Sequence, residues 1–544
     1  MIGKLCHPVA PILYKRNMHL LNNTMRPSNY IKKQLFGAGC ANIQTSAADS
    51  HTAGTVKFSE RKVINKSGVI YEPMIGLEIH VQINSKRKLF SDAFNEFGQA
   101  PNTQVVPFDV AHPGTLPVLN PECVKKAVIT ILGINGEVQT ESFFERKHYF
   151  YPDLPHGYQI TQKRAPVGRG GKITLGLSDQ HPYELSVRIE QLQLEQDTAN
   201  LVALDGATGI NYNRAGAGLM EIVTLPDMAT SQEAACFVTK LQSLLRCLGV
   251  SDCNLEEGSL RCDVNVSVRK AGESPGTRCE LKNLHTPRII AAAIDAEIIR
   301  QISVLESGGK VLQDTRGFDL GSKQTYWMRS KEMAPDYRYM PEPDLPTVLL
   351  RSEDIEILKR DIPELPDQTY QRLVLQHGIR PSDAVSLLSE AGLVSYFDNV
   401  VSLGHPPQIV CNWIVSKLFG IHARSRSRVS AKQLASVLTC VKEGEISEKI
   451  AKDILIAMAE GDSRLAPAII LEKGLAMIGD RSSLQPILIH LIKGNSARVA
   501  QAAKGDSRAI SWFMGQAMRQ TSGRANPTIL REILDELILE TSSR

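Results

Sequence analysis

The chain has 544 residues, too many for one hydrophobic core, so about two to four domains are expected. Its 42% hydrophobic and 22% charged residues are ordinary for a soluble globular protein, and a net charge of +4 does not indicate a protein that coats nucleic acid. No stretch approaches the roughly 18 apolar residues of a membrane span, and none of the ten cysteines forms a C-x-x-C pair, so we expect no membrane insertion, no structural zinc site of that type and no dense disulfide framework.

The N-terminal segment is basic and free of acidic residues. Met1–Ala48 contains six Lys or Arg residues and no Asp or Glu, with Ser, Thr and Asn between short apolar clusters. This composition is typical of a mitochondrial presequence, although a disordered basic arm would look the same. Residues 1–65 are therefore predicted to be a presequence and lead-in, cleaved before Val63, of a protein located in the mitochondrial matrix.

The next region, residues 66–350, is predicted to be a β-rich domain. It consists of short strand-like segments separated by glycines and prolines. Two helices are predicted inside it, Ser231–Leu248 and Pro287–Ser307, the first from apolar residues at helical spacing. The expected strands are antiparallel.

Beyond this region the pattern changes to helix. Residues 351–430 are predicted to form an all-helical domain and residues 431–544 a small helical tail domain. The last helix is predicted to start at Pro527, with Asn526 as its N-cap. The predicted fold class is therefore α+β and multidomain.

Alternate residues of four predicted strands carry carboxylate, amide, imidazole or cationic groups on one face. They are Glu78, His80 and Gln82; Gln193, Glu195 and Asp197; Arg261, Asp263, Asn265 and Ser267; and Glu280 between Arg278 and Lys282. For any single strand, a solvated sheet face is a sufficient explanation. Together the four rows supply hard oxygen ligands for Mg²⁺ and cations for phosphates, so they indicate a metal and phosphate site on a sheet.

No familiar nucleotide-binding loop competes with this site. Gly168–Lys172 superficially resembles a P-loop, but its spacing is wrong and Ile173 stands where a Ser or Thr would reach Mg²⁺. This segment is interpreted as a hairpin turn.

Long strings in the chain resemble those of one protein family in type and order. They are IGLEIHVQ (75–82), PNTQVVP (101–107), PGTLPVLN (113–120), RKHYFYPDLPHGYQITQ (146–162), GINYNRAGAGLMEIVTLPD (209–227), LEEGSLRCDVNVSVR (255–269), ELKNL (280–284), QDTRGFD (313–319), MRSKEMAPDYRYMPEPDLP (328–346) and GQAMRQTSGRANP (515–527). The family is GatB, the B subunits of aspartyl/glutamyl-tRNA amidotransferases. The resemblance covers most of Tyr71–Leu350 and the C-terminal end.

This resemblance implies a reaction and partners. GatB enzymes bind misacylated Glu-tRNA(Gln), phosphorylate its side-chain carboxylate with ATP and Mg²⁺, and let ammonia displace the phosphate. A GatA-like amidase subunit makes the ammonia, and a small GatC-like subunit completes the complex. An acyl phosphate would hydrolyse in open water, so a closed site fed with ammonia would protect it. The resemblance also implies a cradle-like shape for the catalytic domain, residues 66–350.

The resemblance also implies the functional residues. Glu78, His80, Glu195 and Glu280 are the expected catalytic residues, with His80, Glu195 and Glu280 as metal ligands and Glu78 and Asp263 in or beside the ligand set. Phosphate contacts are expected from Arg214, Arg261 and Lys282, although Lys282 could equally form an ion pair with Glu280. Tyr149, Tyr151, Asp153 and Tyr158 either shape the acceptor-end or channel region or pack in the core.

The chain departs from the family pattern in three places. Bacterial relatives often bind zinc through four cysteines near positions 91–110, whereas no cysteine occurs here from 91 to 120, so zinc is not expected. Gln193 and Gln196 replace the usual His and Glu, and Ala217–Gly218 replaces a pair ending in Pro. Two alternatives therefore stay open: a tRNA-binding scaffold that has lost kinase activity, and a generic phosphotransferase built on an acidic sheet.

The tail carries a local excess of positive charge. Between Leu491 and Arg531 there are seven basic residues and one acidic residue. A solvated helical surface would explain this excess, but the resemblance favours contact with the body of the tRNA. Arg498, Lys504, Arg519 and Arg524 are the expected phosphate contacts.

Overall fold

The computed structural model describes residues 57–59, 61–255, 257–330, 336–390, 392–422 and 428–542. Most of the predicted presequence, residues 1–56, lies outside them. Strand β1 (Lys57–Ser59) pairs with β2 (Lys62–Ile64), and β2 pairs with β3 (Ile70–Gln82). Val63 is buried, so the fold begins before the expected boundary at residue 66. These strands are too short to show a periodic pattern in the sequence.

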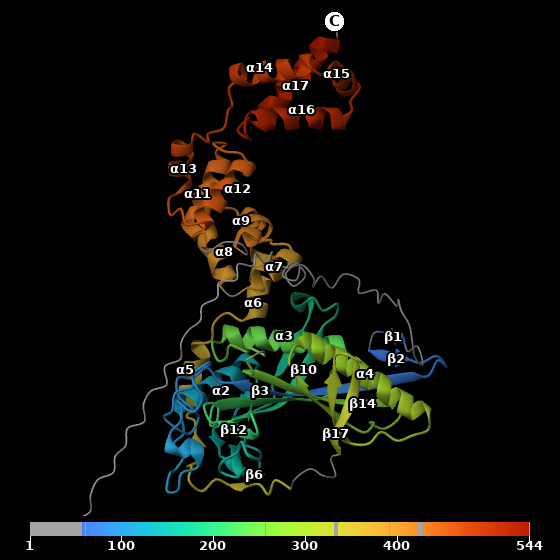
Figure 1. Ribbon diagram of the computed structural model, residues 1–544, viewed down its shortest axis with the longest axis vertical. Coiled ribbons are helices and arrows are strands. Elements are labelled where there is room, and N and C mark those ends of the chain that lie inside the picture. The colour runs from blue at the N-terminus through green and yellow to red at the C-terminus, as the bar shows by residue number, and fades with distance from the viewer. Residues whose placement is uncertain are drawn as a thin grey trace, which may run out of the picture. The chain divides into compact units, whose positions relative to one another are not determined.

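Within the described residues, twelve strands form one large sheet (Figure 1). Besides β1, β2 and β3, they are β4 (Glu137–Val138), β8 (Gly168–Arg169), β9 (Lys172–Leu175), β10 (Leu185–Gln196), β13 (Gly218–Thr224), β14 (Leu260–Lys270), β15 (Cys279–Leu284), β16 (Asp314–Asp319) and β17 (Gln324–Ser330). Their main order is β17-β16-β15-β14-β3-β13-β10-β8-β4. The long strands β14, β3, β13 and β10 are therefore adjacent at its centre.

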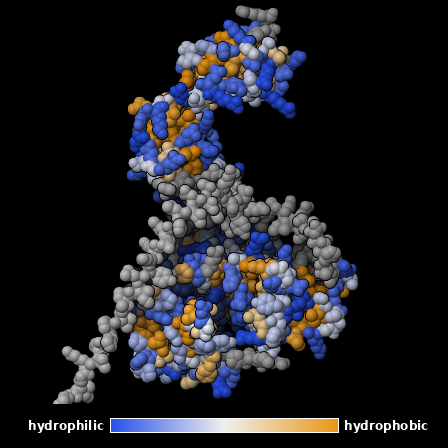
Figure 2. All heavy atoms as spheres, in the orientation of Figure 1, coloured by the Kyte–Doolittle hydropathy of each residue, from blue (hydrophilic) through white to orange (hydrophobic). Residues whose placement is uncertain are grey.

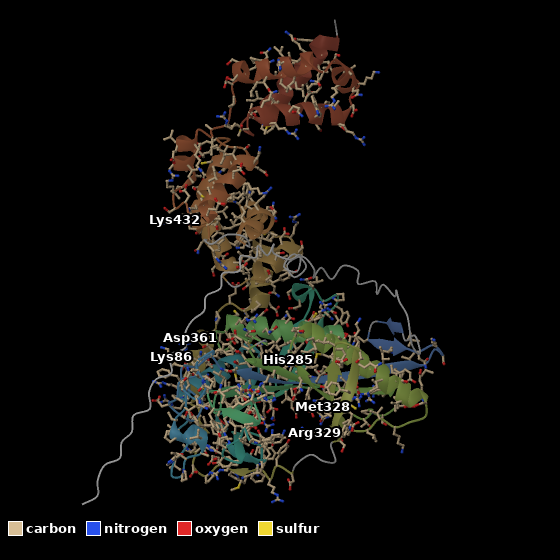
Figure 3. The ribbon with its side chains drawn as sticks, viewed as in Figure 1. Lys86, His285, Met328, Arg329, Asp361 and Lys432 are labelled. Carbon is tan, nitrogen blue, oxygen red and sulfur yellow. The ribbon has the colours of Figure 1, made fainter. Side chains whose placement is uncertain are left out.

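The sheet is not wholly antiparallel as predicted. Strands β15 and β16 run parallel, and the helix α4 (Pro287–Glu306) connects them. A parallel pair needs such a crossover because the chain must return to the same end of the sheet. Thr286 caps α4 by accepting a hydrogen bond from the backbone of Ile289. Strand β17 forms the outer edge, where Met328 and Arg329 lie (Figure 3).

Three helices pack against one face of the large sheet, and α3 and α4 can be seen there in Figure 1. They are α2 (Pro121–Gly133), α3 (Ser231–Cys247) and α4. The structure confirms the predicted α3 and α4 to within one residue. Helix α2 was not predicted, although Asn120 as its N-cap and Pro121 at its first position are recognisable start signals.

The main core lies between these helices and the sheet. Alternate residues of β3, namely Ile75, Leu77, Ile79 and Val81, are at most 1% exposed and belong to this core. Since neighbouring residues of a strand point to opposite faces, the polar residues between them lie on the other face. The apolar face therefore packs against the helices, and the polar face is available for a binding or catalytic site.

The predicted hairpin turn at Gly168–Lys172 is wrong. Strands β8 and β9 both pair with β10 rather than with each other. The chain runs alongside β10 and bends at Gly170 and Gly171, whose φ angles of 66° and 95° favour glycine.

Three small sheets complete this part of the described chain. They are β11 (Asn200–Leu204) with β12 (Ala207–Asn211); β6 (Glu145–His148) between β18 (Met340–Pro341) and β7 (Tyr158–Thr161); and β5 (Glu141–Ser142) with β19 (Val348–Leu349).

After β19 the described elements are helical. They are α5 (Ser352–Arg360), α6 (Pro366–Gln371), α7 (Pro381–Leu388), α8 (Leu393–Ser402), α9 (Pro407–Trp413), α10 (Phe419–His422), α11 (Ala431–Lys442), α12 (Glu448–Ala459), α13 (Ala466–Lys473), α14 (Arg481–Lys493), α15 (Ser496–Ala503), α16 (Ser507–Gln520) and α17 (Pro527–Ser542). The protein thus combines a large sheet domain with a helical C-terminal region.

The helical region contains two hydrophobic clusters. The first runs from Leu373 to Ile470 and the second from Leu484 to Ile538. The expected boundary at residue 430 lies inside the first cluster. Hydrophilic side chains form much of the outer surface of the last bundle, helices α14 to α17, with hydrophobic atoms in its middle (Figure 2).

The last helix agrees with its sequence signals. Asn526 Oδ1 accepts a hydrogen bond 3.0 Å long from the backbone N–H of Thr528, which confirms the predicted cap. None of the helices in the described ranges combines the length and apolar character needed to cross a membrane.

Candidate functional site

Four polar side chains form a row across the centre of the sheet. Arg261 on β14 lies directly opposite His80 on β3. His80 also lies opposite Glu221 on β13, and Glu221 lies opposite Gln193 on β10. Directly paired residues of antiparallel strands share a face. This face is the one opposite the helices, as the two-residue period predicted for β3 and β14.

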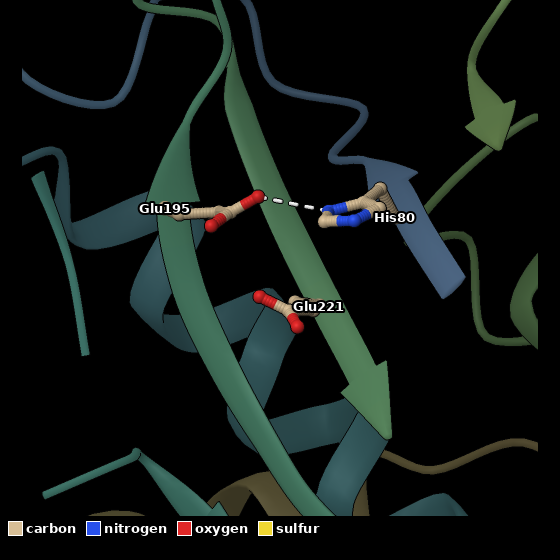
Figure 4. Close-up of side chains that lie close together, drawn as sticks. All are labelled: His80, Glu195 and Glu221. Atoms are coloured by element: carbon tan, nitrogen blue, oxygen red, sulfur yellow. Dashed lines mark hydrogen bonds and ion pairs between the residues drawn. The ribbon is translucent and has the colours of Figure 1, made fainter. Parts of the chain in front are cut away.

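His80, Glu195 and Glu221 form a compact cluster on this face (Figure 4). The His80 Nδ1 and Glu195 Oε1 atoms are 2.8 Å apart. One possible ligand atom from each of the three residues lies within 4.8 Å of the others, and no other such group of His, Cys, Asp and Glu occurs in the part of the chain that the structure describes. The Glu195 side chain is 2% exposed and that of His80 is 23% exposed, so the cluster is reached from the His80 side.

The charges of the cluster are strongly coupled. Burial opposes charge on His80, but Glu195 and Glu221 outweigh it and raise the pKa of His80 to about 9. Burial, followed by repulsion from Glu195, raises the pKa of Glu221 to about 7. Burial also opposes charge on Glu195, yet His80, Lys147 and Arg261 hold its pKa below the usual value. Two carboxylates thus share one imidazole, and the repulsion between them is expressed in the raised pKa of Glu221.

This donor set fits a divalent cation. The two carboxylates supply the oxygen ligands that Mg²⁺ and Mn²⁺ prefer, His80 adds one imidazole nitrogen, and further positions are left for water or phosphate oxygens. Ligand atoms around such an ion lie roughly 3–4 Å apart, given bonds of about 2.1 Å. The cluster, at no more than 4.8 Å, needs only small side-chain rotations to reach that spacing.

Lys147 adds a cation beside the cluster. It lies on β6, in a different sheet, and although burial lowers its pKa, Glu195 and Glu221 help to raise it overall. Its Nζ atom also lies 4.8 Å from the centre of the Tyr337 ring. The carboxylate pair is therefore faced by one fixed positive charge from outside the main sheet.

Aromatic rings continue from this lysine. The Tyr149 ring lies 6.0 Å from Tyr337 and 6.2 Å from Tyr151, and burial raises the pKa of Tyr149, with a smaller effect from Glu195. Tyr158 instead lies under the Arg146 guanidinium at 4.3 Å. The main-chain carbonyl of Asp153 accepts a hydrogen bond from Ala199. Of these four tyrosine and aspartate residues, Tyr149 is thus close enough to the cluster for the charge of Glu195 to affect its pKa.

The other expected metal ligands form a second group farther along the face. Asn265 Nδ2 donates to Glu78 Oε1 at 2.9 Å, and Thr315 Oγ1 donates to Glu280 Oε2 at 3.0 Å. Lys282 Nζ lies 2.5 Å from Asp263 Oδ2 and 3.4 Å from Glu280 Oε1. The structure therefore places His80 and Glu195 together with Glu221, and it places Asp263 and Glu280 around Lys282. Glu78 is hydrogen-bonded to Asn265 and joins neither group directly.

The two expected phosphate-binding arginines meet at the end of β10. Arg261 Nη2 lies 2.8 Å and Arg214 Nε 3.3 Å from Asp197 Oδ2. Arg214 also lines a polar cavity of about 370 Å³ together with Gln82. Both guanidinium groups keep N–H donors beyond this shared carboxylate, because each carries five.

Four basic tail residues were expected to contact tRNA. Arg498, Lys504 and Arg519 are exposed, and the Arg498 guanidinium lies 4.0 Å from the centre of the Trp512 ring. Arg524 is half-buried and donates to the carbonyl oxygen of Gly474 at 3.0 Å. The first three are therefore open to a partner, whereas Arg524 also donates to the residue that caps α13.

Sequence reasoning missed Glu221 and Lys147 as members of the site. The signal for Glu221 was a single carboxylate inside the apolar strand GLMEIVT. Lys147 gave no usable pattern, because β6 has only four residues.

Comparisons with known proteins identify the family of the chain. The family model described as "GatB/GatE catalytic domain" matches residues 73–356, which include the whole cluster, and the "GatB domain" model matches residues 395–538.

Relatives of similar length are also found, and each is the B subunit of an aspartyl/glutamyl-tRNA(Asn/Gln) amidotransferase. The chain is 43% identical to the relative from Rhodopseudomonas palustris, over 85% of this chain and 95% of the relative. It is 42% identical to the relative from Azorhizobium caulinodans, over 89% and 99% of the two chains. The relative from Rhizobium johnstonii is 43% identical over 85% of this chain and 94% of its own. The chain therefore belongs to the GatB family.

Proposed function

We propose that this chain is the B subunit of a mitochondrial tRNA-dependent amidotransferase and activates the glutamyl group of Glu-tRNA(Gln). GatB proteins are parts of amidotransferase complexes, which are ligases that take an amide nitrogen from a donor. Its relatives are subunits acting on aspartyl- or glutamyl-tRNA, which supports the substrate class. The presequence-like segment Met1–Ala48 supports the mitochondrial matrix as its location.

The observation that carries this proposal is the cluster of His80, Glu195 and Glu221 inside the match to the catalytic domain. These three residues would hold Mg²⁺, which supplies charge neutralisation for phosphate and carboxylate oxygens. Lys147, Arg261 and Arg214 provide positive charge at the rim. Such fixed charges stabilise phosphoryl transfer without rearranging during the reaction.

The proposed chemistry has two steps. A side-chain carboxylate oxygen of the glutamyl group attacks the γ-phosphorus of ATP, so an acyl phosphate forms and ADP leaves. Ammonia then attacks the acyl carbon, a C–N bond forms, and inorganic phosphate leaves. Activation is necessary because a free carboxylate is a poor electrophile towards ammonia.

The second step needs ammonia, which this chain would receive from other subunits of the complex. A GatA-like amidase subunit would release ammonia from glutamine, and a small GatC-like subunit would complete the assembly. The tail would contact the tRNA body through Arg498, Lys504, Arg519 and Arg524. Contacts of this kind add affinity without reading base sequence.

The test is the substitution Glu195→Gln in the full chain assembled with its partner subunits. Glu195 is buried and faces His80, so the neutral amide should remove a ligand charge with little change in shape. Conversion of Glu-tRNA(Gln) to Gln-tRNA(Gln) is expected to fall by roughly 100-fold or more. Undiminished conversion would show that this cluster is not the catalytic site and would favour a tRNA-binding scaffold.

A further inference from the structure

Behind the metal-binding cluster lies a chain of neutral hydrogen-bond donors. Gln191 Nε2 donates to Gln193 Oε1 at 2.5 Å, and Gln193 Nε2 donates to Glu221 Oε2 at 2.5 Å. Because the Gln193 oxygen accepts from Gln191, its NH₂ group is the end that faces Glu221. The orientation of this amide is therefore set by its neighbour.

Glu195 is held in a similar way. Thr161 Oγ1 donates to Glu195 Oε2 and accepts from Gln193 Nε2, with both distances at 3.3 Å. The other oxygen of Glu195, Oε1, faces His80 at 2.8 Å. In both Glu195 and Glu221, Oε2 thus accepts a hydrogen bond from a neutral donor, whereas Oε1 does not.

These donors are out of reach of bulk water. The exposed fraction is 7% for Gln191, 3% for Gln193 and 1% for Thr161. If one donor were lost, solvent could not easily replace it, and the carboxylate it holds would be left without a hydrogen bond to fix its orientation. Amide and hydroxyl donors also add no positive charge, so the negative charge of the cluster stays available for a cation.

We infer that Gln193 is a positioning residue that orients Glu221 as a metal ligand, with Gln191 and Thr161 fixing its own orientation. The inference rests on the proposed metal site. It also gives a role to a glutamine that, from the sequence alone, could be taken as a sign of lost activity. A neutral donor behind a ligand typically changes metal affinity about 10–100-fold when removed.

The test measures Mn²⁺ affinity of the full chain by calorimetry, which does not depend on activity. Gln193→Leu is expected to weaken Mn²⁺ binding by at least about tenfold, and Thr161→Val to weaken it less. Gln193→Met, which keeps the length of the side chain but has no N–H donor, is expected to weaken binding as much as Gln193→Leu.

The matched control is Gln301→Leu. Gln301 is also fully buried and donates to a buried carboxylate, Glu297 Oε1, at 2.8 Å, but on the helix side of the sheet. Both Gln301→Leu and Gln193→Leu are expected to lower the Tm, because each removes a buried hydrogen-bond donor, but Gln301→Leu should leave Mn²⁺ affinity unchanged.

Three outcomes decide the inference. Wild-type affinity in folded Gln193→Leu, or an equal loss of affinity in Gln301→Leu, would overturn the positioning role. Absence of Mn²⁺ binding in the wild-type chain would overturn the proposed metal site and this inference together. Weakened binding in both Gln193→Leu and Gln193→Met, with unchanged binding in Gln301→Leu, supports it.

Discussion

Two carboxylates on opposite faces of the sheet, the buried Glu297 and the half-buried Glu221, show how differently similar groups can be used. Glu297 on α4 is 0% exposed and accepts hydrogen bonds from Arg300, Gln301 and Thr325, at 2.6 to 2.9 Å. Burial would raise its pKa, but these partners, chiefly Arg300, lower it overall. Glu221 has one neutral donor and a carboxylate neighbour, and its pKa is raised to about 7.

The difference separates a structural network from a binding site. Around Glu297 the negative charge is balanced by Arg300 and Arg316, so nothing further is required. Glu195 is paired with His80, whereas Glu221 forms no ion pair among the described residues and is repelled by Glu195. A cation bound between the two carboxylates would relieve their repulsion, whereas the paired charges around Glu297 leave no such role for one.

The largest predicted effect comes from neutralising each carboxylate in turn. Glu221→Gln is expected to reduce amidation by roughly 100-fold or more while changing stability little, because it relieves repulsion with Glu195. Glu297→Gln is expected to lower the free energy of unfolding by about 3 kcal/mol, because Arg300 and Arg316 lose their partner. Amidation assays and urea unfolding of both variants measure this. If Glu297→Gln abolished activity without loss of stability, the contrast between the two carboxylates would be wrong.

A smaller effect is predicted for Lys147→Met. Lys147 is attracted by Glu195 and Glu221, so removing it makes the cluster more negative. Mn²⁺ affinity should be retained or increased, whereas amidation should fall about tenfold because charge that develops in the reaction loses a stabilising cation. A parallel fall of metal affinity and activity would indicate that Lys147 only supports the fold.

The smallest effects are predicted for the basic residues of the tail, where exposed side chains can again be compared with one that is hydrogen-bonded within the chain. Arg498, Lys504 and Arg519 are exposed, so replacing all three by Ala should weaken tRNA binding and reduce the slope of log affinity against log salt by about one per lost contact. Arg524→Ala should also lower the Tm, because Arg524 holds the Gly474 carbonyl. Arg481→Ala, which removes an exposed ion pair with Glu536 in the same bundle, is the control. Equal tRNA affinity in the triple variant would remove the tail from the tRNA interface.

Part of this site was predictable because some strands are long and half-buried. The two-residue period placed Glu78 and His80 on one face of the 13-residue strand β3, and Asp263 on the same face of the 11-residue strand β14. The convergence of His80, Glu195 and Glu221 was not predictable in this way. It depends on the order β3-β13-β10, which is a property of the folded sheet.

The missed features have the same origin. The segment Gly168–Lys172 has the composition of a turn, but its partner is β10, about twenty residues farther along the chain. The strand β6, which carries Lys147, is too short for a period. The parallel pair β15 and β16 follows from the crossover helix α4, whose existence was predicted but whose docking was not. Local pattern thus predicted elements and faces, and tertiary pairing decided the site.

The central claim is that this chain activates the glutamyl carboxylate with ATP. The most direct measurement is ADP formation by the assembled complex without an ammonia source, comparing Glu-tRNA(Gln) with uncharged tRNA(Gln). We predict ADP formation that requires the glutamyl group and is lost in Glu195→Gln. ADP formation at the same rate with uncharged tRNA would contradict the claim and indicate a generic phosphotransferase.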